Sequence, residues 1–187
     1  MPWTDSSDDE YEEKKYFVRK KQSVSVSKPN TIHWFNPTFI RLSSDTNQTL
    51  YHDDSVSFDY NNTVYGSIYH CPGSPKIHIW EPGYYNVYYS VFINEPAQIS
   101  CFLNGLIISG TTNGSPKQTV NSSEFIMHIT PIHILFDKTK LPSTETSAVF
   151  EIKNHSSYIC PIHLISPPDS GPSVLQNIAV LNIVRIA

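Results

Sequence analysis

Hydrophobic and polar residues alternate along much of the chain, most clearly between Lys76 and Gly110. Three apolar runs in this stretch are separated by Pro82-Gly83, by residues 94–96 and by Asn104-Gly105. Proline, glycine and asparagine at such positions are typical of turns between strands. The pattern therefore predicts three strands in a compact antiparallel meander.

The middle strand of this stretch is apolar on both of its faces, since successive side chains point to opposite sides of a strand. One face carries Tyr85, Val87, Tyr89 and Val91. The opposite face carries Tyr84, Tyr88 and Phe92, together with the polar Asn86 and Ser90. A face exposed to water does not hold three large aromatic residues, so we expect another sheet or another subunit to cover it.

The C-terminal segment, residues 174–186, is also apolar on both faces. One face carries Ala179, Leu181 and Ile183, and the other carries Ile178, Val180, Val184 and Ile186. A strand that is apolar on both faces is buried on both faces. We therefore predict a central strand whose inner face lies in the core and whose outer face meets a neighbouring subunit.

Turn residues divide the rest of the chain into short strands and polar loops. The expected strands are 22–27, 56–60, 64–70, 125–130, 132–137, 147–153 and 158–165, with Asn61-Asn62 and Pro131 at two of the breaks and polar loops at 43–52 and 111–121. No helix-length segment has a convincing 3.6-residue repeat. The class is all-β, and we predict a jelly-roll β-sandwich of about ten antiparallel strands over residues 23–187.

Residues 1–22 form a segment of different composition. An acidic run at 5–13 is followed by basic residues at 14–21, and the charges nearly cancel. A solvated tail is one interpretation. The apolar triplet Tyr16, Phe17 and Val18 favours a second one, a mobile assembly or anchoring arm that joins the open sheet edge of a neighbouring copy.

Several short motifs share their order with a known superfamily. They are Gly83-x-Tyr85-x-Val87-x-Tyr89-Ser90-Val91, Leu103-Asn104-Gly105, residues 106–108, and the strands at 55–59, 66–68 and 179–186. Together they resemble the trimeric jelly rolls of the tumour necrosis factor and complement globular-head superfamily. The resemblance is greatest to its microbial branch, which includes tips of collagen-like spore-surface glycoproteins, exosporium basal-layer proteins, and phage and giant-virus fibre heads. The Gly-X-Y repeat of a collagen stalk is missing from the sequence.

The resemblance implies a homotrimer whose subunit interface contains Tyr84, Tyr88, Phe92, Val180, Val184 and Ile186. We expect a non-enzymatic structural subunit on the outside of a self-assembled particle or filament. A spore surface layer or appendage is the first setting and a virion or fibre the second, with release by cell lysis because residues 1–13 do not resemble a secretion signal. The alternative is an adhesive head that recognises a glycan or protein receptor through loops 43–54 and 111–121, with Asp53, Asp54 and Asn113 as candidate contacts.

Charge and hydropathy exclude other classes of partner. The net charge is −4 and the folded part has no basic patch, so we expect no nucleic acid. No apolar stretch approaches the length of a membrane span.

Candidate chemistry in the sequence is sparse. Eight histidines include no His-x-His pair of the cupin type, and no Gly-x-Ser-x-Gly motif marks a nucleophile. Asp45, Asp53 and Asp54 offer oxygen ligands for calcium without the spacing of a dedicated loop. We therefore expect no catalytic residue, no resident metal and no cofactor.

Cysteines and N-glycosylation sequons indicate whether a chain is made in a reducing or an oxidising compartment. Cys71, Cys101 and Cys160 are an odd number, so they are either small buried hydrophobic residues or one disulfide with a free thiol. Five N-glycosylation sequons begin at Asn47, Asn61, Asn113, Asn121 and Asn154. Without a secretion signal we interpret them as products of the loop composition.

Overall fold

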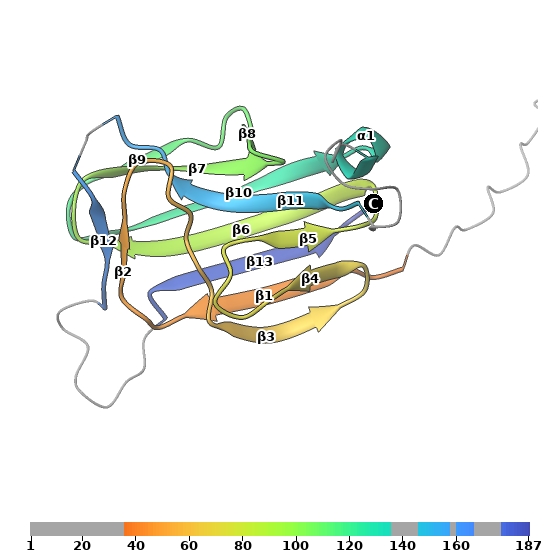
Figure 1. The fold of residues 1–187 in the computed structure, drawn as a ribbon, viewed down its shortest axis with the longest axis horizontal. Coiled ribbons are helices and arrows are strands. Elements are labelled where there is room, and N and C mark those ends of the chain that lie inside the picture. Colours follow the sequence, from red (N-terminus) through yellow and green to blue (C-terminus); the bar gives the residue numbers. More distant parts are fainter. Residues whose placement is uncertain (1–35, 136–145, 158–159, 167–176) are drawn as a thin grey trace, which may run out of the picture. The chain divides into compact units, whose positions relative to one another are not determined.

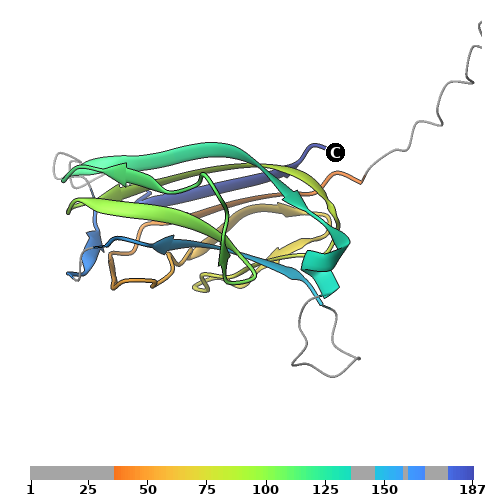
Figure 2. The same ribbon diagram turned by 90° about the horizontal axis from the view of Figure 1, so that it is seen from above.

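Two antiparallel sheets pack face to face in the computed structural model, which describes residues 36–135, 146–157, 160–166 and 177–187 (Figures 1 and 2). The predicted arm, including Tyr16, Phe17 and Val18, and the predicted strand at 22–27 lie outside the described residues. The two layers are separate in Figure 2, and the apolar core lies between them. The prediction of an all-β jelly-roll sandwich is confirmed.

The first sheet, sheet A, has seven strands in the order β2-β12-β6-β13-β1-β3, and β10 pairs along the whole length of β6. Its strands are β1 (Phe39–Ser44), β2 (Gln48–Leu50), β3 (Tyr60–Tyr65), β6 (Gly83–Ile93), β10 (Thr119–Ile129), β12 (Ile162–Leu164) and β13 (Ala179–Arg185). The C-terminal strand β13 lies between β6 and β1, so its predicted central position is confirmed.

The second sheet, sheet B, has six strands in the order β4-β5-β11-β7-β8, with β9 also pairing with β7. Its strands are β4 (Ile68–His70), β5 (Ile77–Ile79), β7 (Ala97–Leu103), β8 (Leu106–Ile107), β9 (Asn113–Ser115) and β11 (Ala148–Asn154). A short helix, α1 (Pro131–Leu135), follows β10.

The predicted meander is wrong in its topology, although its breaks are right. Strands β5, β6 and β7 end at the expected turn residues, but β5 and β7 belong to sheet B and β6 to sheet A. The breaks at Pro82-Gly83 and at residues 94–96 therefore carry the chain across the sandwich, as in a jelly roll. Only β7 and β8 form a hairpin within this stretch, and Asn104 and Gly105 at its tip both have positive φ, 52° and 77°.

Alternation along the strands determines the core. In β6 the inward residues Tyr85, Val87, Tyr89 and Val91 are fully buried, as predicted. In β13 the inward Ala179, Leu181 and Ile183 are also fully buried. Ile178, which the sequence assigned to the outer face, is 1% exposed and belongs to the core because it precedes the regular strand.

Two predicted turns take other structures. Asn61-Asn62 lies inside β3, and the chain turns instead at Gly66, whose φ of 83° favours glycine. Pro131 begins α1 instead of separating two strands, because a proline at the first helical position lacks only a backbone donor that would be unpaired anyway. The loops predicted at 43–52 and 111–121 contain the short strands β2 and β9.

Candidate functional site

The outward face of sheet A is the surface that the sequence marked as an interface. The structure places all six predicted residues on it or at its rim: Tyr84, Tyr88, Phe92, Val180, Val184 and Ile186. Tyr84, Tyr88, Val184 and Ile186 are exposed, whereas Phe92 and Val180 are half-buried. These side chains alternate with the core residues of the same two strands, so the outward face follows from the same periodicity as the core.

Backbone register concentrates the apolar part of this face at one end of the sheet. A single row across five strands contains Ile126, Asn86, Val184, Phe39 and Tyr65. Four of these five side chains are apolar or aromatic. The adjacent row toward the middle of the sheet contains Glu124, Tyr88, Asn182, Arg41 and Thr63 and is mostly polar.

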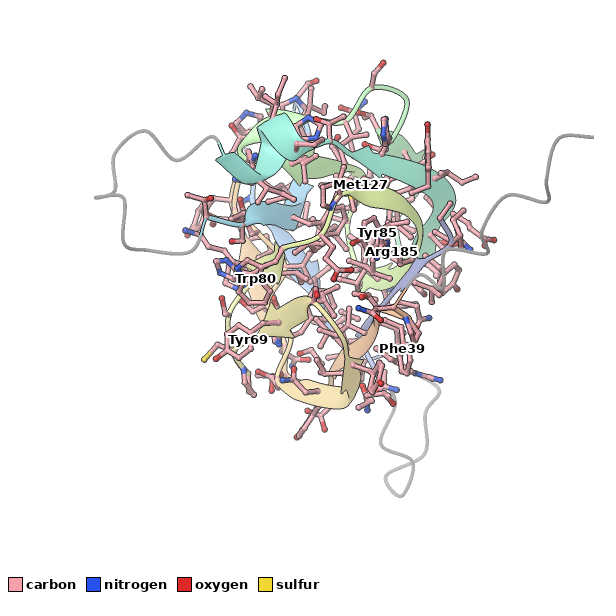
Figure 3. The ribbon with its side chains drawn as sticks, turned by 90° about the vertical axis from the view of Figure 1, so that its right-hand side faces the viewer. Phe39, Tyr69, Trp80, Tyr85, Met127 and Arg185 are labelled. Carbon is pink, nitrogen blue, oxygen red and sulfur yellow. The ribbon has the colours of Figure 1, made fainter. Side chains whose placement is uncertain are left out.

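Aromatic stacking gives this end of the face a fixed shape. Tyr84 stacks on His128 with ring centroids 4.3 Å apart, and Phe39 stacks on Tyr65 at 5.5 Å. Below the face, Tyr85 and Arg185 lie together (Figure 3), where Arg185 forms an ion pair with Glu81. We call the exposed apolar set "face A"; it comprises Phe39, Tyr65, Tyr84, Tyr88, Ile126, Val184 and Ile186.

A second apolar surface lies at the open edge of the sandwich, between the β7–β8 hairpin, β10 and α1. It is a groove of about 650 Å³, which we call the "edge groove", lined by Leu103, Asn104, Leu106, Ile107, Ile108, Ile126, Met127, His128, Ile132 and His133. Leu106 is 75% exposed and Ile132 is 65% exposed. Asn104 donates to the His133 carbonyl at 2.6 Å, which fixes α1 against the hairpin.

The sequence interpretation missed the edge groove and the contribution of Ile126 to face A. Ile126 is 63% exposed and faces outward between the inward-facing Phe125 and Met127. The sequence of β10 therefore contains a run that is apolar on both faces, as β6 does, and this run could have predicted an outward apolar residue at Ile126. Leu106 and Ile107 gave no such signal because β8 is only two residues long.

The three residues named as possible ligand contacts lie in different environments. The Asp53 carboxylate lies beside His52 and His155. The Asp54 carboxylate accepts a hydrogen bond from the Tyr51 backbone at 2.8 Å and so closes its own turn. Asn113 donates to the Tyr89 hydroxyl at 3.3 Å and faces the interior instead of solvent.

The Asp45, Asp53 and Asp54 set considered for calcium is not brought together. Asp45 instead accepts a hydrogen bond from the Tyr60 hydroxyl at 3.4 Å. Among the described residues, the group of three possible ligands that comes within 4.8 Å is His52, Asp53 and His155. The hydrogen bond from His155 lowers the pKa of Asp53.

Among the described residues, the other histidines do not converge between the sheets as they would in a cupin. His70 is buried, where its Nδ1 lies 2.6 Å from the Asn61 side chain, and burial lowers the pKa of its ring. His78 lies on the outward side of sheet B, where its ring stacks on Trp80. Tyr69 and Trp80 are visible together in Figure 3. The core around these strands is otherwise filled by aliphatic and aromatic side chains.

Buried titratable groups in the core serve the packing. Burial raises the pKa of Tyr85 and of Tyr89 to about 12. Tyr85 donates to the Glu81 carbonyl at 2.7 Å and Tyr89 to the Asn121 side chain at 3.0 Å, so both hydroxyls are satisfied.

All three cysteines are free thiols in the structure. Cys101 is buried, and burial raises the pKa of its thiol to about 12. Cys71 and Cys160 are exposed, so the prediction of a small buried hydrophobic residue is right for one cysteine and wrong for two.

Two of the five sequons begin at buried asparagines. Asn121 is 2% exposed and Asn154 is fully buried, and both side chains donate hydrogen bonds to neighbouring loops. The folded chain has no room for a glycan at either position.

Within the described part of the chain, no helix has the length and hydropathy needed to cross a membrane. No protein-family model matches the sequence, and no curated protein does either.

Solved structures with a similar fold come from several sources. The chain is similar to murine APRIL, with 11% identity over 80% of this chain and 99% of that one and a TM-score of 0.47. The globular domain of zebrafish complement 1qA has 8% identity over 82% and 98%, with a TM-score of 0.48. The PRD1 vertex protein P5 has 9% identity over 81% and 97%, with a TM-score of 0.45. These likenesses are of fold alone; the superfamily that the sequence resembles and its microbial branch stay predictions.

Proposed function

We propose that the protein is a non-enzymatic structural subunit that assembles through face A and the edge groove into a homotrimer. The observation that carries the proposal is the pair of exposed apolar surfaces on one subunit. A soluble monomer rarely exposes a large contiguous apolar patch, whereas an interface core is apolar and rich in aromatic residues. Face A supplies the aromatic and β-branched side chains, and the edge groove supplies a concave apolar partner.

The two surfaces differ in shape, which favours a ring over a face-to-face dimer. A two-fold dimer uses the same patch on both copies, so pairing face A with itself would leave Leu106 and Ile132 in water. When the groove of one copy receives face A of the next, both surfaces are covered and the arrangement repeats. The sequence resemblance implies that such a ring closes with three copies.

The chemistry of the edge groove supports assembly more than catalysis. Its titratable side chains are His128 and His133, and both are engaged locally. The His128 ring stacks on Tyr84, and the His133 ring accepts a hydrogen bond from the Thr130 backbone at 3.0 Å. The remaining lining is largely aliphatic, which suits the side chains of another copy.

The position of the trimer on a particle comes from the sequence resemblance. In this proposal the subunits form the outer surface of a spore layer or appendage, or of a virion or its fibre, and residues 1–22 link copies or layers. The alternative of an adhesive head has one observation in its favour. In loop 43–54, the backbone of Asp53 hydrogen-bonds to Asn154, near Ser156. Gln98 hydrogen-bonds to Ser156 and also pairs with Gly114 in loop 111–121. Both candidate loops therefore lie at the same end of the sandwich (Figure 1).

Light scattering coupled to size-exclusion chromatography of the full-length protein tests the proposal. We expect a mass of three chains for the wild type and a lower mass for Leu106→Asp, because a charge in the groove opposes its burial. Tyr69→Asp is the control, since Tyr69 is 50% exposed on the outward side of sheet B, outside both surfaces. A wild-type protein that remains a monomer at high concentration refutes the proposal, and retention of that monomer on a glycan array would favour the adhesive alternative.

A further inference from the structure

The His52, Asp53 and His155 side chains form a cluster that the assembly surfaces do not use. His52 and Asp53 lie in the turn after β2, and His155 follows β11, about a hundred positions later in the chain. One ligand atom from each residue lies within 4.8 Å of the others. The two imidazole rings stack with centroids 5.4 Å apart, so both rings lie on the same side of this loop pair.

The hydrogen bond of His52 shows which of its nitrogens carries the proton when the ring is neutral. Nδ1 lies 2.8 Å from the backbone carbonyl of Ser156, and a carbonyl can only accept, so Nδ1 carries the proton. In the neutral ring Nε2 then presents a lone pair, and this atom lies 3.5 Å from Asp53 Oδ2. A lone pair and a carboxylate oxygen therefore face each other, and a cation between them removes their repulsion.

The supporting residues hold this arrangement in place. Asn154 is fully buried and donates from its side chain to the Leu50 and Tyr51 carbonyls at 3.0 and 3.1 Å. Its side-chain oxygen accepts from the Ser156 hydroxyl at 2.6 Å, which fixes the segment whose carbonyl orients His52. Metal-binding histidines typically donate their second ring nitrogen to such a carbonyl, which sets the tautomer and the ring orientation.

We propose that His52 Nε2, the Asp53 carboxylate and His155 Nδ1 bind a divalent transition metal ion of the zinc type. Imidazole nitrogen and carboxylate oxygen are ligands that zinc prefers, at about 2.0–2.2 Å. Tetrahedral ligands at that range are about 3.3 Å apart. Asp53 Oδ2 lies 3.5 Å from His52 Nε2, Asp53 Oδ1 lies 2.9 Å from His155 Nδ1, and one ligand atom from each residue lies within 4.8 Å of the others. His155 donates from Nδ1 to Asp53 in the structure, and it becomes a ligand by holding its proton on Nε2 instead.

The proposed ion would join the turn after β2 to the end of β11. Because the chain supplies three ligands, the fourth tetrahedral position is left for water or for a group from another molecule. Asp53 has a φ of 65°, a left-handed conformation that asparagine and aspartate adopt more readily than other non-glycine residues. The substitution Asp53→Asn therefore preserves the turn while it removes the charge.

Zinc titration of the full-length, untagged, chelator-washed protein tests the site. We expect isothermal titration calorimetry to give one zinc site per chain. Zinc affinity is expected to fall by at least about 100-fold in His52→Gln and in His155→Gln. Loss of a residue that only supports a ligand costs about 10–100-fold, so a larger loss identifies a ligand. Asp53→Asn is expected to weaken binding in the same direction. The control is His163→Gln: His163 Nδ1 pairs with Glu95 at 2.9 Å without a third ligand among the described residues, and its loss leaves zinc affinity unchanged.

Cobalt substitution gives a second readout that does not depend on affinity. Co²⁺ bound by the wild type is expected to show the intense visible absorption of a tetrahedral site, and His155→Gln is expected to abolish it. Circular dichroism and the melting temperature of the metal-free variants establish that they are folded. The proposal is overturned if the wild type takes up no zinc, or if His52→Gln and His155→Gln both bind zinc as the wild type does.

Discussion

Val184→Asp is the most direct perturbation of face A. Val184 lies in the central strand β13, in the apolar row between Asn86 and Phe39, and is 44% exposed in the single subunit. Full burial of a valine side chain is worth about 1.5–3 kcal/mol, so covering the remaining exposed part on assembly gains about 0.7–1.3 kcal/mol per copy. Aspartate loses this gain, and a buried, unpaired carboxylate costs several kcal/mol more.

The expected effect is at least about 4 kcal/mol per interface, which corresponds to about a thousandfold weaker association. A closed ring contains the substitution at every interface, so the Val184→Asp protein is expected to be monomeric at micromolar concentrations. Val149→Asp is the matched control, because Val149 is half-buried on the outward side of sheet B and undergoes the same chemical change. Any general loss of strand propensity affects both variants, whereas loss of assembly is expected only in the first.

Mixing two variants distinguishes a ring from a face-to-face dimer. Val184→Asp damages face A but leaves the edge groove intact, and Leu106→Asp does the reverse. If the groove of one copy binds face A of the next, equal amounts of the two variants form one productive interface and give a heterodimer by native mass spectrometry. A Val184→Asp protein with the wild-type mass, or a mixture that stays monomeric while the wild type is trimeric, refutes this reasoning.

Two further predictions concern stability. Gly66→Ala is expected to destabilise the fold by about 1–3 kcal/mol in urea unfolding, because its φ is 83° and a Cβ would lie 2.5 Å from a backbone oxygen; Gly110→Ala, with φ of 80° and open space around the Cβ, is expected to cost only the backbone strain. Tyr85 and Tyr89 ionise near pH 10 when unfolded, and burial raises both pKa values to about 12, so their contribution is complete below pH 10 and is lost as the pH rises toward 12. Urea midpoints measured across this window are expected to fall less steeply in Tyr85→Phe, and an unchanged slope contradicts the assignment.

Periodicity predicted the parts of the fold in which each strand is long enough to alternate several times. Within the bounds of β6 and β13 the inward and outward sets were correct, because eleven and seven residues, respectively, repeat the same pattern; Ile178, just before β13, was not. The strand at 147–153 was placed to within one residue for the same reason. The prediction that a second layer covers the outward face stays a prediction, because Tyr84, Tyr88 and Val184 are exposed in the single subunit.

Sheet membership could not be predicted in the same way. Pro82-Gly83 and residues 94–96 mark breaks, but a turn within a sheet and a crossing between sheets use the same residues. The choice depends on long-range pairing such as β6 with β13, which is separated from it by about ninety positions. Pro131 was ambiguous for a related reason, since proline both ends strands and begins helices.

The histidine cluster shows why a site can be absent from sequence patterns and present in the fold. His52 and Asp53 are adjacent in the sequence, and the neighbouring Asp54 closes its own turn, so the third residue of the cluster is His155, about a hundred positions away. Spacing rules for metal sites do not cover such a separation. The third ligand arrives because Asn154 pairs with the turn after β2 through both its backbone and its side chain. Asn154 was noticed in the sequence only as the start of a sequon, yet its burial makes it a positioning residue for His52 and His155. A buried polar side chain that joins two distant loops therefore indicates that the residues beside it, here His52, Asp53 and His155, are held close together.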